Sequence, residues 1–149
     1  MRKTFLFIIF LLTISCAGYE PIFSSKNFKY SFDEIIFEEN DKISKKISRK
    51  LFNFSPKNME RIKIKINSED DEIVLSKDSK GNPLIFEINI ITEVKVEFNN
   101  TESKILKFNE KFSFNNQTNK FNLNQYRDSI KENLTDKIFD KIIFQLRLL

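Results

Sequence analysis

The clearest pattern along the chain is an alternation of apolar and polar positions over residues 84–98. Every even position in this range is apolar except Thr92, and the odd positions carry mostly charged or amide side chains. Successive side chains of a strand point to opposite faces of a sheet, so a period of two predicts a strand with one buried face. At roughly 3.3 Å per residue this strand would extend about 50 Å, well beyond the length of an average strand.

Three shorter segments alternate in the same way and are also predicted to be strands. They are residues 26–39, 61–67 and 104–115. An acidic run at residues 69–72 follows the second of them and is predicted to be a turn or bulge, after which apolar residues resume at 73–75. Turn signals at residues 80–83 and a polar stretch at 99–103 flank the longest strand. That strand and the one after it are therefore expected to form an antiparallel hairpin.

Two segments show the helical period of three to four residues instead. Over residues 41–54, apolar positions recur at spacings of 4, 4 and 3, lysine and arginine occupy the other faces, and Asn40 or Asp41 can cap the start. The second predicted helix begins at Asn122 or Asn124 and runs to the C-terminus. Its apolar positions recur at four-residue steps: Tyr126, Ile130, Leu134, Ile138, Ile142 and Leu146.

Sheets and helices that each have one apolar face bury these faces against one another. The predicted fold is therefore α+β, a two-layer sandwich of a four-stranded, mainly antiparallel sheet with two helices on one face, in the order strand-helix-strand-strand-strand-helix. The other face of the sheet would display Lys63, Lys65, Glu87, Glu93, Lys95, Glu97 and Lys107. This face is interpreted either as ordinary solvent-exposed surface or as a contact surface. The basic face of the 41–54 helix is open to the same two interpretations.

Composition limits the chemistry available to the chain. Its 149 residues suit one domain, and 31% charged with 40% hydrophobic residues is a foldable composition. Histidine is absent, which removes the commonest metal ligand and the best proton-transfer group near neutral pH. With Gly18 and Gly81 as the only glycines there is no G-x-S-x-G motif, and residues 69–72 lack the spacing of a Ca²⁺ loop. No enzyme, metal site or cofactor is expected, and a net charge of +4 is too weak to indicate nucleic-acid binding.

The amino terminus has the features of a lipoprotein signal peptide over residues 1–15. Two basic residues precede an apolar run at residues 5–12 that is too short to span a membrane. A serine then lies directly before Cys16, as in a lipobox, which predicts cleavage before Cys16 and acylation of this cysteine. Ordinary cleavage after Ala17 is the alternative. The prediction divides the chain into a signal peptide (1–15), an acylated tether (16–25) and a single α+β domain (26–149).

The residues that follow the signal peptide match a short motif. Residues 16–23 read Cys-Ala-Gly-Tyr-Glu-Pro-Ile-Phe. The mature start of the LptE family, the lipoproteins of lipopolysaccharide assembly, typically reads Cys-Gly-Phe-x-Pro-Leu-Tyr, so this chain resembles it with Ala17 inserted. The family also shares the predicted order of elements, and an asparagine-rich stretch similar to residues 115–121 precedes its last helix. The resemblance covers the whole mature chain.

The resemblance implies a role without catalysis. LptE-like proteins are lipid-anchored at the periplasmic face of the outer membrane of Gram-negative bacteria. There they plug the β-barrel LptD, aid its assembly and contact lipopolysaccharide on its way to the outer leaflet. The implied partners are thus an LptD-type barrel, lipopolysaccharide and the membrane. The candidate polar contacts to sugar phosphates or the barrel wall are Lys63, Lys65, Lys95 and Lys107. The alternative is an unrelated periplasm-facing lipoprotein that binds a ligand or scaffolds an assembly.

Overall fold

The computed structural model describes residues 28–38, 41–55, 59–98 and 102–149. Its strands and helices, in chain order, are β1 (Tyr30–Ile36), α2 (Lys42–Phe54), β2 (Glu60–Lys77), β3 (Pro83–Phe98), β4 (Glu102–Asn115) and α3 (Lys120–Leu148). The predicted order of elements is confirmed. The predicted signal peptide, Cys16 and the tether to residue 25 lie outside the described residues, so they stay predictions.

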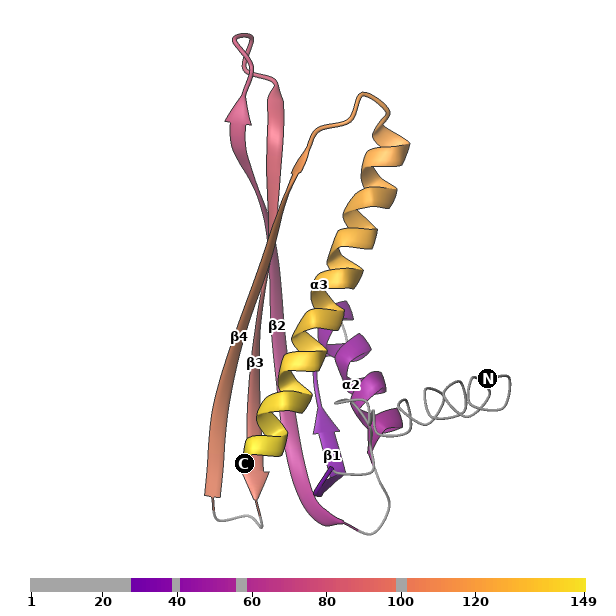
Figure 1. Ribbon diagram of the computed structural model, residues 1–149, viewed down its shortest axis with the longest axis vertical. Coiled ribbons are helices and arrows are strands. Elements are labelled where there is room, and N and C mark those ends of the chain that lie inside the picture. Colours follow the sequence, from indigo (N-terminus) through magenta and orange to yellow (C-terminus); the bar gives the residue numbers. More distant parts are fainter. Residues whose placement is uncertain (1–27, 39–40, 56–58, 99–101) are drawn as a thin grey trace, which may run out of the picture.

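The four strands form one mixed sheet in the order β1-β2-β3-β4. β1 runs parallel to β2, whereas the β2–β3 and β3–β4 pairs are antiparallel. Figure 1 shows both helices on the same side of this sheet, with α2 over β1 and β2 and α3 over β3 and β4. The predicted two-layer α+β sandwich is therefore confirmed. Its one parallel pair arises because α2 carries the chain back to the end of the sheet where β1 began.

β2 and β3 form a hairpin that is longer than the rest of the sheet. Their pairing runs from Ile62 opposite Phe98 to Lys77 opposite Pro83. Figure 1 shows the far end of this hairpin projecting beyond α3. The long strand predicted over residues 84–98 is thus confirmed, and the structure adds Pro83 at its start.

The acidic run at residues 69–72 belongs to this hairpin, so the predicted turn or bulge there is wrong. Its last residue, Glu72, lies opposite Ile88, and the register up to that point is unbroken. The first register shifts lie further along β2, on either side of Ser76. The run stays extended because β3 supplies backbone hydrogen-bond partners along its whole length, which outweighs the low strand propensity of acidic residues.

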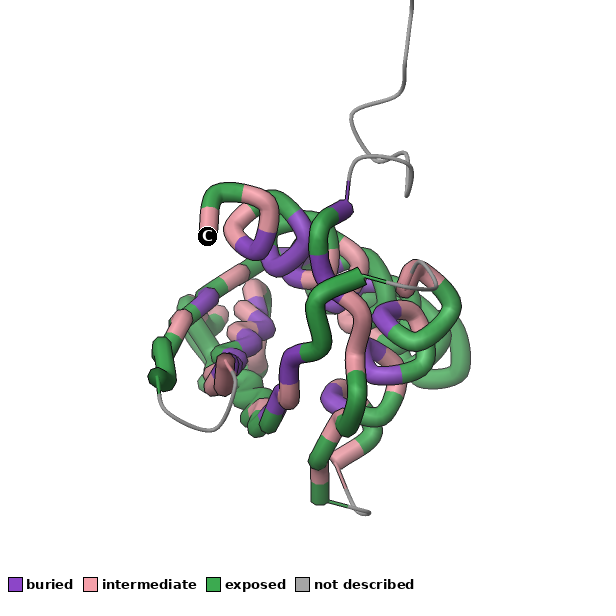
Figure 2. Tube along the Cα trace, turned by 90° about the horizontal axis from the view of Figure 1, so that it is seen from below, coloured by how far each residue is buried: buried purple, intermediate pink, exposed green. Residues whose placement is uncertain are grey.

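The core lies between the sheet and the helices. Figure 2, which looks along the molecule, shows buried positions in both layers and their alternation with exposed positions along the strands. The fully buried side chains include Ile47, Leu51, Ile64, Ile88, Ile90, Leu134, Ile138 and Ile142. The predicted apolar face of β3 is buried at its even positions from Phe86 to Val96. Leu84 is exposed, because the hairpin has passed beyond the helix layer at that point.

A polar junction inside this core joins the start of α2 to β2 and β3. Asp41 caps α2 and accepts hydrogen bonds from the backbone N–H groups of Ser44 and Ser68, both at 2.8 Å. The Ser44 hydroxyl donates to Ser68 Oγ at 2.8 Å, and Ser68 Oγ lies 2.9 Å from the Thr92 hydroxyl. Thr92, the polar residue in the apolar row of β3, is therefore buried with a hydrogen-bond partner, as buried hydroxyls require.

α3 begins earlier than predicted, because Asn119 rather than Asn122 or Asn124 caps it. The Asn119 side-chain oxygen accepts hydrogen bonds from the backbone N–H groups of Phe121 at 2.9 Å and Asn122 at 3.2 Å. All three asparagines satisfy the local preference for a cap, so local sequence cannot rank them. With Asn119 as the cap, Leu123 lies at the end of the first turn, where it is buried in the core.

Candidate contact surfaces

The face of the sheet that points away from the helices, here the outer face, is defined by the register of β2, β3 and β4. Three neighbouring cross-strand rows lie on it: Lys63–Glu97–Ser103, Lys65–Lys95–Ile105 and Asn67–Glu93–Lys107. The four lysines predicted as contact residues therefore all lie on the outer face, and within these three rows. The structure brings them together from three separate strands.

Three of these lysines pair with carboxylates of the same face. The distances from Nζ to the carboxylate are 3.7 Å for Lys63–Glu34, 2.6 Å for Lys95–Glu97 and 3.0 Å for Lys107–Glu93. The hydrogen bond and charge of Lys95, with a smaller contribution from the charge of Lys63, hold the pKa of Glu97 below its ordinary value. Solvent-exposed pairs of this kind contribute little stability, so they can exchange partners at small cost.

Lys65 differs from the other three. Among the described residues, no carboxylate lies within ion-pair distance of its ammonium group. Lys65 lies opposite Lys95, and Ile36 and Ile105 flank these two lysines on the neighbouring strands. Like charges that face each other across a strand pair are unfavourable. An external anion is therefore favoured at Lys65, opposite Lys95, over the rest of the outer face.

The sequence identifies the outer face but not the partners on it. Glu34 belongs to β1, and its pairing with Lys63 depends on how β1 and β2 are aligned. The bond between Lys95 and Glu97 is local, and the spacing of two residues along one strand is the signal that could have indicated it. The other ion pairs follow from the register, which alternation alone does not specify.

The tip of the β2–β3 hairpin exposes apolar side chains on both of its faces. They are Ile73, Val74, Leu75 and Leu84. The turn is closed by Asp78, whose carboxylate accepts hydrogen bonds at 2.8 Å from the backbone N–H groups of Lys80 and Asn82, and Gly81 has a φ of +85°. These bonds, with that of the Asn82 side chain first, lower the pKa of Asp78. The sequence predicted the turn, but Leu84 was expected in the core.

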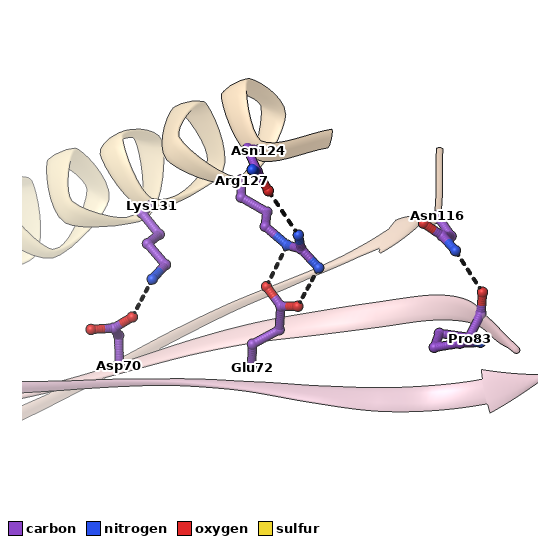
Figure 3. A network of polar contacts seen from close by, with 7 residues as sticks. All are labelled: Asp70, Glu72, Pro83, Asn116, Asn124, Arg127 and Lys131. Carbon is purple, nitrogen blue, oxygen red and sulfur yellow. Dashed lines mark hydrogen bonds and ion pairs between the residues drawn. The ribbon is translucent and has the colours of Figure 1, made fainter. Parts of the chain in front are cut away.

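Charged pairs join the first half of α3 to the helix-facing side of the hairpin, as Figure 3 shows. Arg127 donates to both carboxylate oxygens of Glu72, from Nε at 2.8 Å and from Nη2 at 2.7 Å. Lys131 pairs with Asp70 one turn further along α3. The Arg127 guanidinium also lies 4.9 Å from the centre of the Phe86 ring. Alternate carboxylates of the acidic run thus hold α3 over the sheet.

Part of the predicted basic face of α2 forms a helix–helix contact. Lys46 Nζ lies 2.7 Å from Glu132 of α3, and Lys50 Nζ lies 2.6 Å from Asp136. Burial acts to raise the pKa of Asp136, but hydrogen bonds from Lys50 and Lys46 outweigh it and leave the pKa lowered. These two lysines therefore help dock α2 onto α3, and the other basic residues of α2 are not part of this contact.

An open groove of about 450 Å³ lies between β4 and α3. Phe112 lines it from β4, and Tyr126 and Asp140 line it from α3. Phe112 and Tyr126 were expected in the core but are exposed, because both lie at the rim of the helix layer. Burial is the main cause of a raised pKa at Asp140.

Neither a metal centre nor a membrane-spanning helix is found among residues 28–38, 41–55, 59–98 and 102–149. The acidic side chains in these ranges form no group of three or more that could hold one ion. The helices in these ranges have no stretch that is both long and apolar enough to cross a bilayer.

No protein-family model matches this chain, and no curated protein sequence matches it. Solved structures match it in fold. Rare lipoprotein B from Shewanella oneidensis is 11% identical with a TM-score of 0.57, over 76% of this chain and 92% of that one. A minor lipoprotein from Acinetobacter baumannii is 11% identical with a TM-score of 0.57, over 81% and 92% of the two chains. An uncharacterized lipoprotein B from Nitrosomonas europaea is 10% identical with a TM-score of 0.59, over 87% and 90%.

These matches extend over most of this chain and nine-tenths or more of each neighbour, so they concern the whole domain rather than a shared motif. Identities of 10–11% are too low to transfer the role of any residue. What the likeness establishes is architecture: this chain has the fold of a group of bacterial lipoproteins that includes rare lipoprotein B.

Proposed function

We propose that this protein is a lipoprotein of the outer membrane, anchored through Cys16 at the periplasmic face, that plugs an LptD-type β-barrel, helps to assemble it and assists insertion of lipopolysaccharide into the outer leaflet. It acts by contact and catalyses no reaction. The observation that carries the proposal is the fold shared with rare lipoprotein B, which is another name for LptE. The LptE-like motif at residues 16–23 supports the same family independently of the fold.

The shape of the β2–β3 hairpin suits a plug. A strand of 16 residues, such as β3, extends about 50 Å at roughly 3.3 Å per residue. The hydrocarbon core of a bilayer is about 30 Å thick, so a hairpin of this length can run through the full height of a barrel.

The chemistry of the outer face suits the inside of a barrel. The lumen wall of an outer-membrane barrel is polar, and the outer face is a polar surface crossed by exposed ion pairs. Such pairs can be exchanged for pairs with the barrel wall, because each contributes little within the isolated chain. The outer face can therefore be covered by a polar partner that supplies an anion for Lys65, without leaving its other charges unpaired.

Lys65 is the favoured position on this face for a phosphate of lipopolysaccharide, and Lys95 can join it by exchanging Glu97 for the phosphate. The two lysines lie opposite each other, and Lys65 has no carboxylate partner among the described residues. Lys63, Lys95 and Lys107 pair with Glu34, Glu97 and Glu93, so they contact a phosphate or the barrel wall only after releasing these partners.

The anchor follows from the predicted processing of the amino terminus. Cleavage before Cys16 would leave this cysteine with two or three acyl chains. At about 0.8 kcal/mol for each buried methylene, two or more chains hold a protein at a membrane durably, whereas a single chain is marginal.

Purification from its own membrane tests the proposal. The full chain is tagged at the C-terminus, extracted in mild detergent and analysed by mass spectrometry for co-purifying proteins and for acylation of Cys16. A photo-crosslinking amino acid at Asn109, on the outer face of β4, is compared with one at Ser129, an exposed residue of α3 beside the groove. We expect a stoichiometric outer-membrane barrel and crosslinks to it from Asn109 only.

Three outcomes would overturn the proposal in different ways. An acylated chain that purifies without a barrel would support the alternative, a free-standing lipoprotein that binds a ligand or scaffolds an assembly. A chain with an unmodified thiol at Cys16 would exclude the anchor. Equal crosslinking from Asn109 and Ser129 would show that the outer face is not the contact surface.

A further inference from the structure

α2 carries a stripe of four exposed side chains on one face. They are Lys42, Lys45, Arg49 and Phe52. Their spacings of 3, 4 and 3 residues place them along a single side of the helix, over a length of about 15 Å. The opposite side of α2 is buried through Ser44, Ile47, Ser48 and Leu51. This set of four exposed residues is called the α2 stripe below.

The cations of the α2 stripe have no neutralising anion in the part of the chain that the structure describes. Among the described residues, no carboxylate lies within ion-pair distance of Lys42, Lys45 or Arg49. The adjacent Lys46 differs, since it pairs with Glu132 of α3. The stripe therefore presents three available positive charges on the side of α2 that faces away from α3.

An aromatic ring and an apolar groove lie beside these charges. The Phe52 side chain is 72% exposed and lines a groove of about 410 Å³ between α2 and β1. Phe32 and Ile35 line the same groove from β1. Asp33 also lies there, but it pairs with Arg61 at 3.6 Å. Exposed aromatic rings next to basic residues are typical of surfaces that lie in the headgroup region of a membrane.

The described chain starts next to α2. Phe28 packs against Phe54 in the last turn of α2, with ring centroids 5.3 Å apart. Residues 17–27 separate Cys16 from Phe28, and fully extended they span at most about 40 Å. Acyl chains on Cys16 would therefore hold α2 close to the membrane surface in which they are inserted.

We propose that the α2 stripe docks on the anionic phospholipid headgroups of the membrane that holds the acyl chains, and so fixes the orientation of the domain. This proposal rests on the acylation of Cys16. A basic residue close to an anionic leaflet strengthens binding about fivefold, so three together give on the order of 100-fold. That is weak for a free protein, but the anchor raises the effective concentration of α2 at the surface. The outer face of the sheet lies on the other layer and stays free for a second partner.

The test measures the distance of α2 from lipid in the full, acylated chain. Because Cys16 is the only cysteine and is blocked by acylation, an Asn53→Cys variant carries a fluorophore at the groove and an Asn109→Cys variant carries it on the outer face. The proteins are inserted in vesicles of phosphatidylcholine, with or without about one third phosphatidylglycerol, and quenching by brominated lipids is recorded. We expect at least about twofold stronger quenching at position 53 than at 109, only in vesicles that contain phosphatidylglycerol.

Two charge-reversal variants of equal net charge separate the stripe from a general charge effect. The stripe variant is Lys42→Glu, Lys45→Glu, Arg49→Glu, and the control is Lys77→Glu, Lys80→Glu, Lys104→Glu. All six residues are exposed, so thermal unfolding followed by circular dichroism should show both variants folded. The stripe variant should lose the excess quenching at position 53, and the control should keep it. Equal quenching at the two label positions, or an equal loss in both variants, would overturn the proposal.

Failure of the anchor can be told apart from failure of the stripe. Mass spectrometry of the same sample reports whether Cys16 is acylated. If it is not, the proposed anchor is wrong, and flotation of that chain with phosphatidylglycerol vesicles tests the stripe alone. At low ionic strength, where the attraction between basic residues and anionic lipid is strongest, stronger flotation of the unmodified chain than of the stripe variant would support docking, and equal flotation of the two would overturn it.

Discussion

Arg127 and Glu72 lie 55 positions apart in the sequence, and their side chains meet through two hydrogen bonds of 2.8 and 2.7 Å. Asn124 accepts a further hydrogen bond from Arg127 Nη1 at 3.1 Å, and the Phe86 ring lies against the guanidinium. Planar, two-point pairing of this kind is stronger and more directional than a single charge contact. It holds the first half of α3 over the β2–β3 hairpin, close to the end where Val74 and Leu84 are exposed.

Removing this pair should destabilise the fold. Arg127→Ala is expected to lower the free energy of unfolding by about 1–3 kcal/mol, because the two side chains are only 25% and 28% exposed and Glu72 would lose its partner. Arg127→Lys keeps the charge but not the two-point geometry, and should fall in between. Urea unfolding measures the free energy of unfolding of both variants. Asp71→Asn, a neighbouring change on the outer face, should stay within about 0.5 kcal/mol of the unaltered chain; a comparable loss there would contradict the prediction.

The junction at Asp41 should be sensitive to removal of its carboxylate. Asp41→Ala deletes the acceptor for the N–H groups of both Ser44 and Ser68, so we expect a loss of about 1–3 kcal/mol in the free energy of unfolding. Asp41→Asn should recover part of it, since one amide oxygen still caps α2. The control is Glu38→Ala, because Glu38 contacts Asp41 through its backbone carbonyl alone. Chemical denaturation would refute the idea if both alanine variants behaved alike.

Two isoleucines three positions apart on β3 should lose very different amounts of stability on truncation. Ile88 is fully buried, and Ile88→Ala should cost about 2–5 kcal/mol through lost burial and the cavity that remains. Ile91 is 45% exposed on the outer face, so Ile91→Ala should change the free energy of unfolding by less than about 1 kcal/mol. The comparison, made by thermal or urea unfolding, checks which face of β3 is covered by the helices. Similar losses would argue against that assignment.

Asp136 and Asp140, one turn apart on α3, should have opposite effects on stability at neutral pH. Lys50 and Lys46 lower the pKa of Asp136 in the folded state, so its ionised form stabilises the fold above the ordinary aspartate pKa. That contribution is lost as the pH falls through this value toward the folded-state pKa. Burial raises the pKa of Asp140, so its ionised form opposes folding once the pH exceeds that raised pKa.

Asp136→Asn should therefore lower, and Asp140→Asn should raise, the free energy of unfolding at pH 7. Each change should stay below about 1 kcal/mol, because both groups are largely exposed. Both differences should shrink as the pH falls below the pKa of each carboxyl in both the folded and the unfolded state, because the two states then bind the same number of protons. Urea unfolding at pH 7 and at low pH measures this. Shifts of the same sign at pH 7 would be inconsistent with the opposite pKa directions.

Lys65 and Lys95 should contribute to binding of lipopolysaccharide, if the outer face receives its phosphates as proposed. Each lysine-to-alanine change is expected to weaken binding about fivefold, the usual effect of one basic residue near an anionic lipid group. Binding of purified lipopolysaccharide to the full chain, with rising salt, gives the measurement. Lys137→Ala, on the exposed side of α3, serves as the control. Equal losses at all three positions would point to net charge rather than to a site.

Local patterns predicted the elements of this protein well. Alternation marked β3 and assigned its faces, the spacing of Ile47 and Leu51 marked the buried side of α2, and Asp41 was correctly expected as a possible cap. These features depend on residues a few positions apart, which share one strand face or one helix turn. A short segment therefore contains everything needed to predict its secondary structure and its apolar side, without knowledge of the rest of the fold.

Errors appeared where a distant segment decided the outcome. Residues 69–72 stay in β2 because β3 pairs with them and because Arg127 and Lys131 meet alternate carboxylates. Phe112 and Leu84 continue an apolar pattern but are exposed, since the helix layer does not extend over them. The extent of one layer over another is a property of the packed molecule, and no local window contains it.

The sequence by itself determined the order of the strands and helices, the apolar side of the central ones, and which lysines lie on the outer face. Only the tertiary structure decided which carboxylate each lysine meets and which charges are left available. The strand register and helix docking place Lys46 next to Glu132 while leaving Lys42, Lys45 and Arg49 without an anion among the described residues. The physical reason is that side-chain periodicity is local, whereas ion pairing depends on distances of a few ångströms between segments far apart in the chain.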